Sequence, residues 1–322
     1  PTLPFGLQDV QGEGHGVGEA THLLDVDLSL RLREQARLAG VSAASLFHLA
    51  WARVLGTLSG RQNVVFGTVL LGRMQGGEGA DRALGMFINT LPLRVDVAQV
   101  SVRAAVKSTH ARLTALLGHE HASLALAQRC SGVAATTPLF NALLNYRHSA
   151  GVEDAVEMDQ AWHGMYLLHA EERTNYPITL SVDDLGEQFN LSALVVSPIE
   201  ARRICDYLLT AVTHLVQALE QTPQLPLEHI TVLPMDETRQ VLEAFNATAR
   251  AYPDGQTVHD VFQQQAAATP HAVAAVQGAV SLSYTQLNAR ANKLAHHLLG
   301  LGAAPGDRVA ILLERSLDLL VA

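Results

Sequence analysis

The sequence predicts an α/β protein, because segments with the hydrophobic spacing of helices and of strands alternate along the chain. In 197–221 apolar residues recur every three or four positions, which is the stripe of an amphipathic helix. In 178–195 apolar and polar residues alternate on both sides of a turn, which predicts an antiparallel hairpin with one buried face. From residue 257 onward, helical and strand patterns follow in a β–α–β order, as at the start of an α/β domain.

The composition is that of a protein with a packed core. The 322 residues are 48% hydrophobic and 16% charged, which suits one large domain or two of ordinary size. A net charge of −9 and the absence of Lys and Arg runs argue against nucleic acid as a partner. No stretch of eighteen apolar residues occurs, so neither a membrane-spanning helix nor a membrane partner is expected. Cys130 and Cys205 match no metal spacing, and the sequence predicts a reduced, cytoplasmic protein.

Both ends of the sequence predict a piece of a longer chain. The start, PTLPFGLQDV, has neither an initiator methionine nor the basic and apolar regions of a signal peptide. The last residues, RSLDLLVA, stop inside an apolar run.

The first sixty residues predict a loop and two helices. The Gly-rich segment 11–19 is expected to be a flexible surface loop. A helix is predicted over 29–40, with Ser29 as its N-cap and Gly40 just past its end. A second helix is predicted over 42–60 from its apolar spacing.

Strands and helices alternate in the next segment. The β-branched segment 63–71 predicts a strand buried on both faces. A second strand is predicted over 86–97, and Pro92 places that strand at a sheet edge or a bulge. The further elements expected before the hairpin are a helix over 102–117, a short helix around LALAQRC and a strand over 138–147.

A proline-rich segment predicts the domain boundary. The long helix 197–221 is expected to begin with a Ser197/Glu200 capping box and Pro198 in its first turn. The segment TPQLPLEHITVLPMDE that follows has three prolines, which prevent a long regular element. Beyond it we expect a helix over 257–270, a hairpin over 272–284, a helix over 285–302 and a buried strand over 307–313.

Common catalytic and ligand motifs are absent or poorly placed. The Gly-rich segments 12–18 and 76–79 do not connect a strand to a helix as a dinucleotide loop must. The run His119, Glu120 and His121 is interpreted as solvated surface, because alternate residues do not converge on a metal. No metal site is expected, and no G-x-S-x-G motif marks a serine hydrolase.

Two pairs of adjacent polar residues are given structural interpretations. Asp183 and Asp184 are assigned to a hairpin turn, where aspartate bonds locally. His296 and His297 are assigned to the polar shoulder of a helix, because adjacent helical positions point about 100° apart.

One strand resembles a signature of the condensation domains of nonribosomal peptide synthetases. The family pattern G-x-F-V-N-T followed by L-x-x-R is matched by LGMFINTLPLR, with Ile88 in place of valine and Arg94 as the arginine. The neighbouring segments SLFHLAWARVLGTLSGRQNVVFGTVLLGR, TPLFNALLNYRHS and HITVLPMDE resemble the family's sequence in the same order.

The end of the chain resembles the opening of an adenylation domain. LSYTQL, residues 282–287, is similar to its first core motif L-[TS]-Y-x-E-L, with Gln286 in the acidic position. The two resemblances imply a condensation-domain C-terminal lobe over 1–222, a linker over 223–255 and a truncated adenylation (AMP-binding) domain over 256–322.

The resemblance implies a chloramphenicol-acetyltransferase-like lobe with a mixed sheet and flanking helices, followed by a truncated α/β adenylation domain. Its activity would be peptide-bond formation between a carrier-bound thioester donor and an aminoacyl acceptor. Phosphopantetheine arms of partner carrier protein domains would enter a tunnel between two lobes, and other synthetase modules would be further partners. ATP and Mg would serve the complete adenylation domain. This fragment itself is expected to bind no cofactor.

The family's catalytic motif, H-H-x-x-x-D-G, is absent from this sequence. The only His-His pair is 296–297, with Leu301 at the aspartate position, and it lies in the adenylation portion. We therefore expect no catalytic residue in this fragment and expect the fragment alone to be inactive. Tunnel contacts are expected at five residues, although Asn89 and Thr90 could instead satisfy backbone groups at a strand end. The five are Gly85, Phe87, Asn89, Thr90 and Asn145.

Two alternatives to a peptide-bond-forming domain remain open. One is an epimerisation-type or other carrier-dependent acyltransferase of the same fold. The other is a non-catalytic scaffold that docks carrier proteins. An intact H-H-x-x-x-D-G motif in the preceding sequence would favour an enzyme.

Overall fold

The computed structural model divides into two compact units, Pro1–Asn246 and Ala247–Ala322. Each unit is described by itself. The residues described are 2–7, 16–72, 84–134, 136–148, 174–252 and 254–322.

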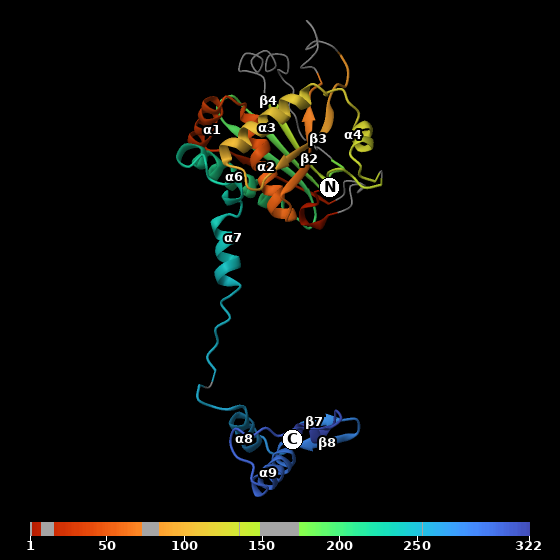
Figure 1. The fold of residues 1–322 in the computed structure, drawn as a ribbon, viewed down its shortest axis with the longest axis vertical. Coiled ribbons are helices and arrows are strands. Elements are labelled where there is room, and N and C mark those ends of the chain that lie inside the picture. Colours follow the sequence, from red (N-terminus) through yellow and green to blue (C-terminus); the bar gives the residue numbers. More distant parts are fainter. Residues whose placement is uncertain (1, 8–15, 73–83, 135, 149–173, 253) are drawn as a thin grey trace, which may run out of the picture. The chain divides into compact units, whose positions relative to one another are not determined.

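The first unit is built on a six-stranded mixed sheet with strand order β1-β6-β5-β4-β2-β3 (Figure 1). Strand β4 runs parallel to both β2 and β5, and the other neighbouring pairs are antiparallel. The strands are β1 (Val17–Leu23), β2 (Asn63–Leu70), β3 (Asn89–Asp96), β4 (Ala142–His148), β5 (Ile178–Asp184) and β6 (Phe189–Val196).

Four helices pack against one face of this sheet, which we call the helix face (Figure 1). They are α1 (Val26–Ala39), α2 (Ala43–Ser59), α3 (Val102–Leu117) and α6 (Ala201–Gln221). The short helix α4 (Leu124–Cys130) belongs instead to a small apolar cluster around Phe140 and Leu143. Helix α7 (Met235–Arg239) and a following π-helical turn (Gln240–Ala244) end the unit.

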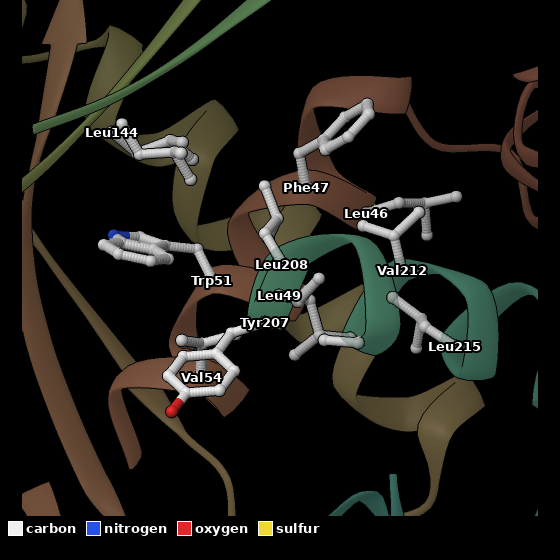
Figure 2. Close-up of a cluster of buried hydrophobic side chains, with 14 of the residues drawn as sticks. Leu46, Phe47, Leu49, Trp51, Val54, Leu144, Tyr207, Leu208, Val212 and Leu215 are labelled. Carbon is white, nitrogen blue, oxygen red and sulfur yellow. The ribbon is translucent and has the colours of Figure 1, made fainter. Parts of the chain in front are cut away.

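The main core lies between the sheet and helices α2 and α6. Trp51 and Phe47 of α2 are fully buried and lie near Leu208 of α6 and Leu144 of β4 (Figure 2). Burying an aromatic or leucine side chain stabilises a fold by about 1.5–3 kcal/mol each. This core therefore explains why the long amphipathic stripe of 197–221 folds onto the sheet.

The second unit has a small core of its own. Leu282, Leu287 and Leu317 are buried there and pack against Phe262. Its elements are α8 (Val258–Ala268), β7 (Val273–Gln277), β8 (Val280–Ser283), α9 (Tyr284–Gly300) and α10 (Leu317–Val321).

Most of the predicted elements are confirmed, including the helices at 42–60 and 102–117 and the 178–195 hairpin. Pro92 lies on β3, which is an edge strand as predicted. Gly40 ends α1 in the left-handed conformation, with φ of 66°. These elements have clear hydrophobic spacing or characteristic end residues in the sequence, and packing in the folded protein favours the same structure.

Two predicted helix starts are wrong. Helix α1 begins at Val26, because the Asp25 carboxylate caps it by accepting from the Asp27 N–H at 2.7 Å, and the predicted cap Ser29 is buried. Helix α6 begins at Ala201, so the predicted Ser197/Glu200 box and the first-turn Pro198 do not form. The Ser197 N–H donates instead to the Gly16 carbonyl at 2.9 Å, which keeps that residue with the sheet.

Three strand predictions also need correction. The segment 307–313 is exposed and forms no strand, since β7 and β8 pair only with each other in the described part of the second unit. The strand predicted over 86–97 begins at Asn89, where pairing with β2 starts. Of the loop predicted over 11–19, residues 11–15 lie outside the described residues, and Val17 onward forms β1.

Candidate functional site

The signature segment lies where β2 ends and β3 begins, at one end of the sheet. Gly85 has φ of 149°, a conformation that favours glycine, and a Cβ there would lie 3.0 Å from the Phe87 ring. A Cβ on Gly72 would lie 2.0 Å from the Phe87 carbonyl oxygen, so that position also requires glycine. The half-buried Phe87 is thus held between two glycines at the entry to β3.

Asn89 fastens the start of β3 to the turn before α4. Its side-chain amide donates to the carbonyl oxygens of Glu120 and Ala122, at 2.8 and 2.7 Å, and its Oδ1 accepts from the Thr90 N–H at 2.9 Å. These bonds use both amide hydrogens and the oxygen, so for Asn89 the structure supports the backbone-satisfying role. A substrate contact by Asn89 stays a prediction.

Glu120 departs from its predicted place on a solvated surface. Glu120 is only 1% exposed, and its carboxylate oxygen Oε1 lies 3.7 Å from Nε2 of the exposed His121. The Asn89 bonds to the Glu120 and Ala122 carbonyls hold this turn against the start of β3. Among the described residues no group of three or more His, Cys, Asp or Glu side chains could hold a metal ion.

Asp183 and Asp184 are more than turn residues, which corrects their sequence interpretation. Asp184 is 3% exposed and accepts hydrogen bonds from the Arg33 guanidinium and from the Tyr146 hydroxyl, the latter at 2.7 Å. Asp183 pairs instead with Arg147 at 2.6 Å. The local turn bond exists as well, because the Gly186 N–H donates to Asp184 at 3.1 Å.

The surroundings of Asp184 hold its pKa at about 2. Burial favours the neutral acid, but the hydrogen bonds from Arg33, Tyr146 and the Gly186 N–H together outweigh burial. The Arg33 guanidinium also lies 4.1 Å above the centre of the Phe189 ring. The ion pair of Arg33 and Asp184 therefore ties α1 to the ends of β4, β5 and β6.

Asn145 and Thr90 lie on the other face of the sheet, which we call the second face. Leu144 of β4 packs in the core on the helix face, so the adjacent Asn145 points to the second face. Leu144 pairs with Thr68, and the next residue of β2, Val69, pairs with Thr90. The structure thus places two of the five predicted tunnel residues, Thr90 of β3 and Asn145 of β4, in one row on either side of β2, while Asn89 points toward α4.

His296 and His297 are both exposed on α9, as predicted for a polar shoulder. No sequence pattern singles out a different histidine, His48 of α2, which is 3% exposed. His48 Nδ1 lies 2.6 Å from the Ala44 carbonyl, which can only accept, so Nδ1 carries the proton. Nε2 then accepts from the Thr68 hydroxyl at 2.7 Å, and burial lowers the pKa of His48 to about 4.

Two family models match the chain in order. The Condensation domain model matches residues 12–242, and the AMP-binding enzyme model matches residues 262–322. The mixed sheet, its helix layer and the Gly85–Arg94 signature are thus those of a condensation domain. The chain belongs to the nonribosomal peptide synthetase family, as a condensation-domain segment that continues into the start of an AMP-binding domain.

Curated relatives match almost the whole chain. Malpibaldin synthetase from Mortierella alpina is 48% identical over 321 residues, which are 100% of this chain and 6% of that protein. A linear gramicidin synthase from Brevibacillus parabrevis is 34% identical over 310 residues, which are 95% of this chain and 4% of that protein. The chain therefore spans only a small part of the length of these relatives.

Solved structures share the fold at low sequence identity. A holo four-domain nonribosomal peptide synthetase bound to AMP and glycine has a TM-score of 0.73 at 15% identity, covering 95% of this chain and 24% of that one. The first condensation domain of the CDA synthetase has a TM-score of 0.51 at 16% identity, covering 69% of this chain and 49% of that one.

No single helix among the described residues is long and apolar enough to cross a membrane. Helices α1 and α2 pass that test only as a pair, with a bend of 104° between them.

Proposed function

We propose that the intact domain containing this chain joins a carrier-bound thioester donor to a carrier-bound aminoacyl acceptor. The acceptor amine attacks the thioester carbonyl, a C–N bond forms, the C–S bond breaks, and the proton lost by the amine reaches the departing thiolate. The observation that supports this proposal best is the condensation-domain match over residues 12–242, with its signature at the sheet end described above.

The contribution proposed for this lobe is positioning. Holding two bound reactants in a fixed geometry converts a bimolecular step into an effectively unimolecular one, which accounts for a large part of many catalysed reactions. The H-H-x-x-x-D-G motif is absent from this sequence, so we assign no proton transfer to any residue of the chain. Carrier protein domains and neighbouring synthetase modules are the proposed partners.

The proposed domain ranges are 1–222 for the condensation lobe, 223–255 for the linker and 256–322 for the start of the adenylation domain. ATP and Mg belong to the complete adenylation domain. The described residues of the second unit offer neither a phosphate-binding loop nor a cluster of carboxylates for a metal, so no step through ATP is derived. We place the protein in the cytoplasm.

The test uses the parent synthetase polypeptide with its donor and acceptor carriers loaded. Mass spectrometry is expected to detect the condensed peptidyl thioester on the acceptor carrier. If loaded carriers bind but no amide product forms, the scaffold alternative replaces this proposal. If only an epimerised donor is recovered, the epimerisation alternative replaces it. The 322-residue chain alone is expected to form no peptide and to show no amino-acid-dependent pyrophosphate exchange.

A further inference from the structure

A cavity of about 200 Å³ lies between α4 and the segments that lead into β4 and β5. We call it the α4 cavity. Helix α4 contributes Leu124 and Gln128 to its lining, the segment before β4 contributes residues 138–140, and the segment before β5 contributes Asn175 and Tyr176. Three parts of the chain that are distant in sequence therefore enclose one space.

The α4 cavity lies on the second face of the sheet. Its lining residues Leu124, Phe140 and Tyr176 pack in a cluster with Leu143 of β4. The adjacent Leu144 belongs to the core on the helix face, so Leu143 points to the second face. Asn145 is on the same face, two residues further along β4 and thus about 6.7 Å away. The cavity is therefore a neighbour of the predicted tunnel residue Asn145.

The lining of the α4 cavity is uncharged and mainly apolar. Leu139 and Phe140 are buried, and none of the lining side chains is acidic or basic. Tyr176 is the titratable residue among them, and burial raises the pKa of its hydroxyl, so the lining stays neutral. A charged group would lose its hydration there without meeting an opposite charge. The cavity thus suits an uncharged, apolar group.

Hydrogen bonds and ring packing hold the walls of the α4 cavity in place. The side-chain nitrogen of Gln128 donates to three carbonyl oxygens between α4 and β4, at distances from 3.0 to 3.3 Å. The rings of Phe140 and Tyr176 stack with their centres 5.7 Å apart and their planes at 16°. A Cβ on Gly67 would lie 2.5 Å from Phe140 Cε2, so the Phe140 ring rests on the backbone of β2. The cavity is therefore formed before any ligand binds.

The size and walls of the α4 cavity indicate an aromatic occupant. An apolar cavity of ~150 Å³ is large enough to bind benzene, so this one accommodates a phenyl or phenol ring. Aromatic rings favour offset or edge-to-face packing against other rings, which the stacked Phe140 and Tyr176 offer. A methyl group would leave most of the space empty.

We propose that the α4 cavity binds the aromatic side chain of a carrier-bound aminoacyl group and makes this lobe selective for such a residue. The proposal deepens the proposed function and rests on it. In a thioester the carboxyl group of the amino acid carries no charge, as the neutral cavity requires. The aminoacyl group belongs either to the donor or to the acceptor carrier, and the test distinguishes these two sources.

The test uses the parent polypeptide with its carriers loaded chemoenzymatically. One carrier at a time receives a phenylalanyl or an alanyl group, and mass spectrometry measures the rate of amide formation at low carrier concentration. On the carrier whose aminoacyl group enters the cavity, the phenylalanyl group should react about tenfold faster. Equal rates for the two groups on both carriers would overturn the proposal.

Variants of α4 connect this preference to the cavity. Leu124→Phe fills the space, so the ratio of phenylalanyl to alanyl rates should fall about tenfold. The matched control is Leu126→Phe on the same helix, which is 44% exposed and does not line the cavity, and it should leave the ratio unchanged. If circular dichroism shows that Leu124→Phe does not fold, Asn175→Phe at an exposed position of the lining provides the same comparison. An unchanged ratio in a folded lining variant contradicts the proposal.

A photoreactive side chain reports binding without condensation. A 4-azidophenylalanyl group is loaded on each carrier in turn, and irradiation should label peptides that contain Leu124 or Phe140. Amide formation with the label elsewhere overturns the α4 cavity and leaves the proposed function intact. Labelling of these peptides in a parent that never forms an amide supports the α4 cavity and overturns the proposed function.

Discussion

Arg33 of α1 and Asp184 at the end of β5 form an ion pair in which Nη2 lies 2.5 Å from Oδ1, across 151 residues of sequence. The Asp184 side chain is 5% exposed, and that of Arg33 is 28% exposed. Because Asp184 also accepts from Tyr146 of β4, one carboxylate joins a helix of the helix face to two adjacent strands. The C-terminal ends of β4 and β5 are thus held to α1 by the Asp184 carboxylate.

Replacing Asp184 with asparagine should destabilise the first unit. The substitution keeps the shape but removes the charge, so Arg33 is left half-buried without its counter-ion, at a cost of about 2 kcal/mol. Chemical denaturation followed by circular dichroism measures the change. The matched control is Glu34→Gln, which removes an exposed pair with Arg37 and should leave the free energy of unfolding nearly unchanged. Equal effects of the two substitutions would show that the ion pair of Arg33 and Asp184 is only a surface pair.

The stability of the first unit should fall as the pH drops from about 6.5 to about 4. Burial lowers the pKa of His48 to about 4, so between these values the unfolded chain binds a proton that the folded chain does not. The contribution of neutral, buried His48 to the free energy of unfolding is complete above pH 6.5 and is lost by about pH 4. Its size is about 3 kcal/mol, from the difference between the two pKa values.

The control for this pH dependence is His48→Gln, which removes the titrating group. Its free energy of unfolding should be lower at neutral pH and flatter between pH 6.5 and 4. The decline seen below pH 4 should remain, because Asp184 loses its own contribution as the pH falls from 3.8 toward about 2. An unchanged slope in His48→Gln between pH 6.5 and 4 would assign the effect to other groups.

The sequence predicts the elements of this fold better than it predicts their ends. Helix α2 and the β5–β6 hairpin have local hydrophobic patterns that packing reinforces, so their prediction is confirmed. The starts of α1 and α6 depend on which of several polar residues the tertiary structure leaves free to cap. Ser29 is drawn into the core and Ser197 into the sheet, which no local pattern reveals.

The candidate site is only partly accessible to sequence reasoning. A family signature locates Gly85 to Thr90, but the hydrogen bonds of Asn89 to the turn before α4 depend on a contact between distant segments. The alignment of Thr90 with Asn145 on the second face depends on strand order, because their strands β3 and β4 are separated by β2. Register between distant strands is set by the whole sheet, so a pattern within one strand does not contain it.

Gly67→Ala should destabilise the first unit although alanine is the smallest possible addition. A Cβ at this position of β2 would lie 2.3 Å from Leu143 Cδ2 and 2.5 Å from Phe140 Cε2. Both side chains must shift, at a cost of about 1–3 kcal/mol in thermal or chemical unfolding. Gly300→Ala is the matched control, because nothing lies within 4 Å of a Cβ there and the residue ends α9. It should leave its unit as stable or slightly more stable.

Limited trypsin digestion should separate the two units by an early cut after Arg250. The chain around Arg250, just past the boundary of the units, is exposed and has no regular structure, whereas most other described Lys and Arg residues lie on helices or strands; cuts after the exposed Arg308 or Arg315 remove only a short C-terminal piece. Proteases need an extended, accessible backbone, so two large fragments should appear early. Arg250→Gln should slow this cut strongly, and early cleavage at Arg239 of α7 instead would mean that α7 is frayed.

Substituting His296 and His297 with alanine should leave peptide formation by the parent synthetase unchanged. Both side chains are exposed on α9, in the second unit, and a helix shoulder contributes little to stability. The measurement is the rate of condensed product on the acceptor carrier, with circular dichroism to confirm that the double variant folds. His48→Gln is the contrasting histidine substitution, because it removes a buried hydrogen bond to Thr68 and should lower the unfolding temperature. A large loss of condensation in a folded His296/His297 variant would place a functional contact on α9.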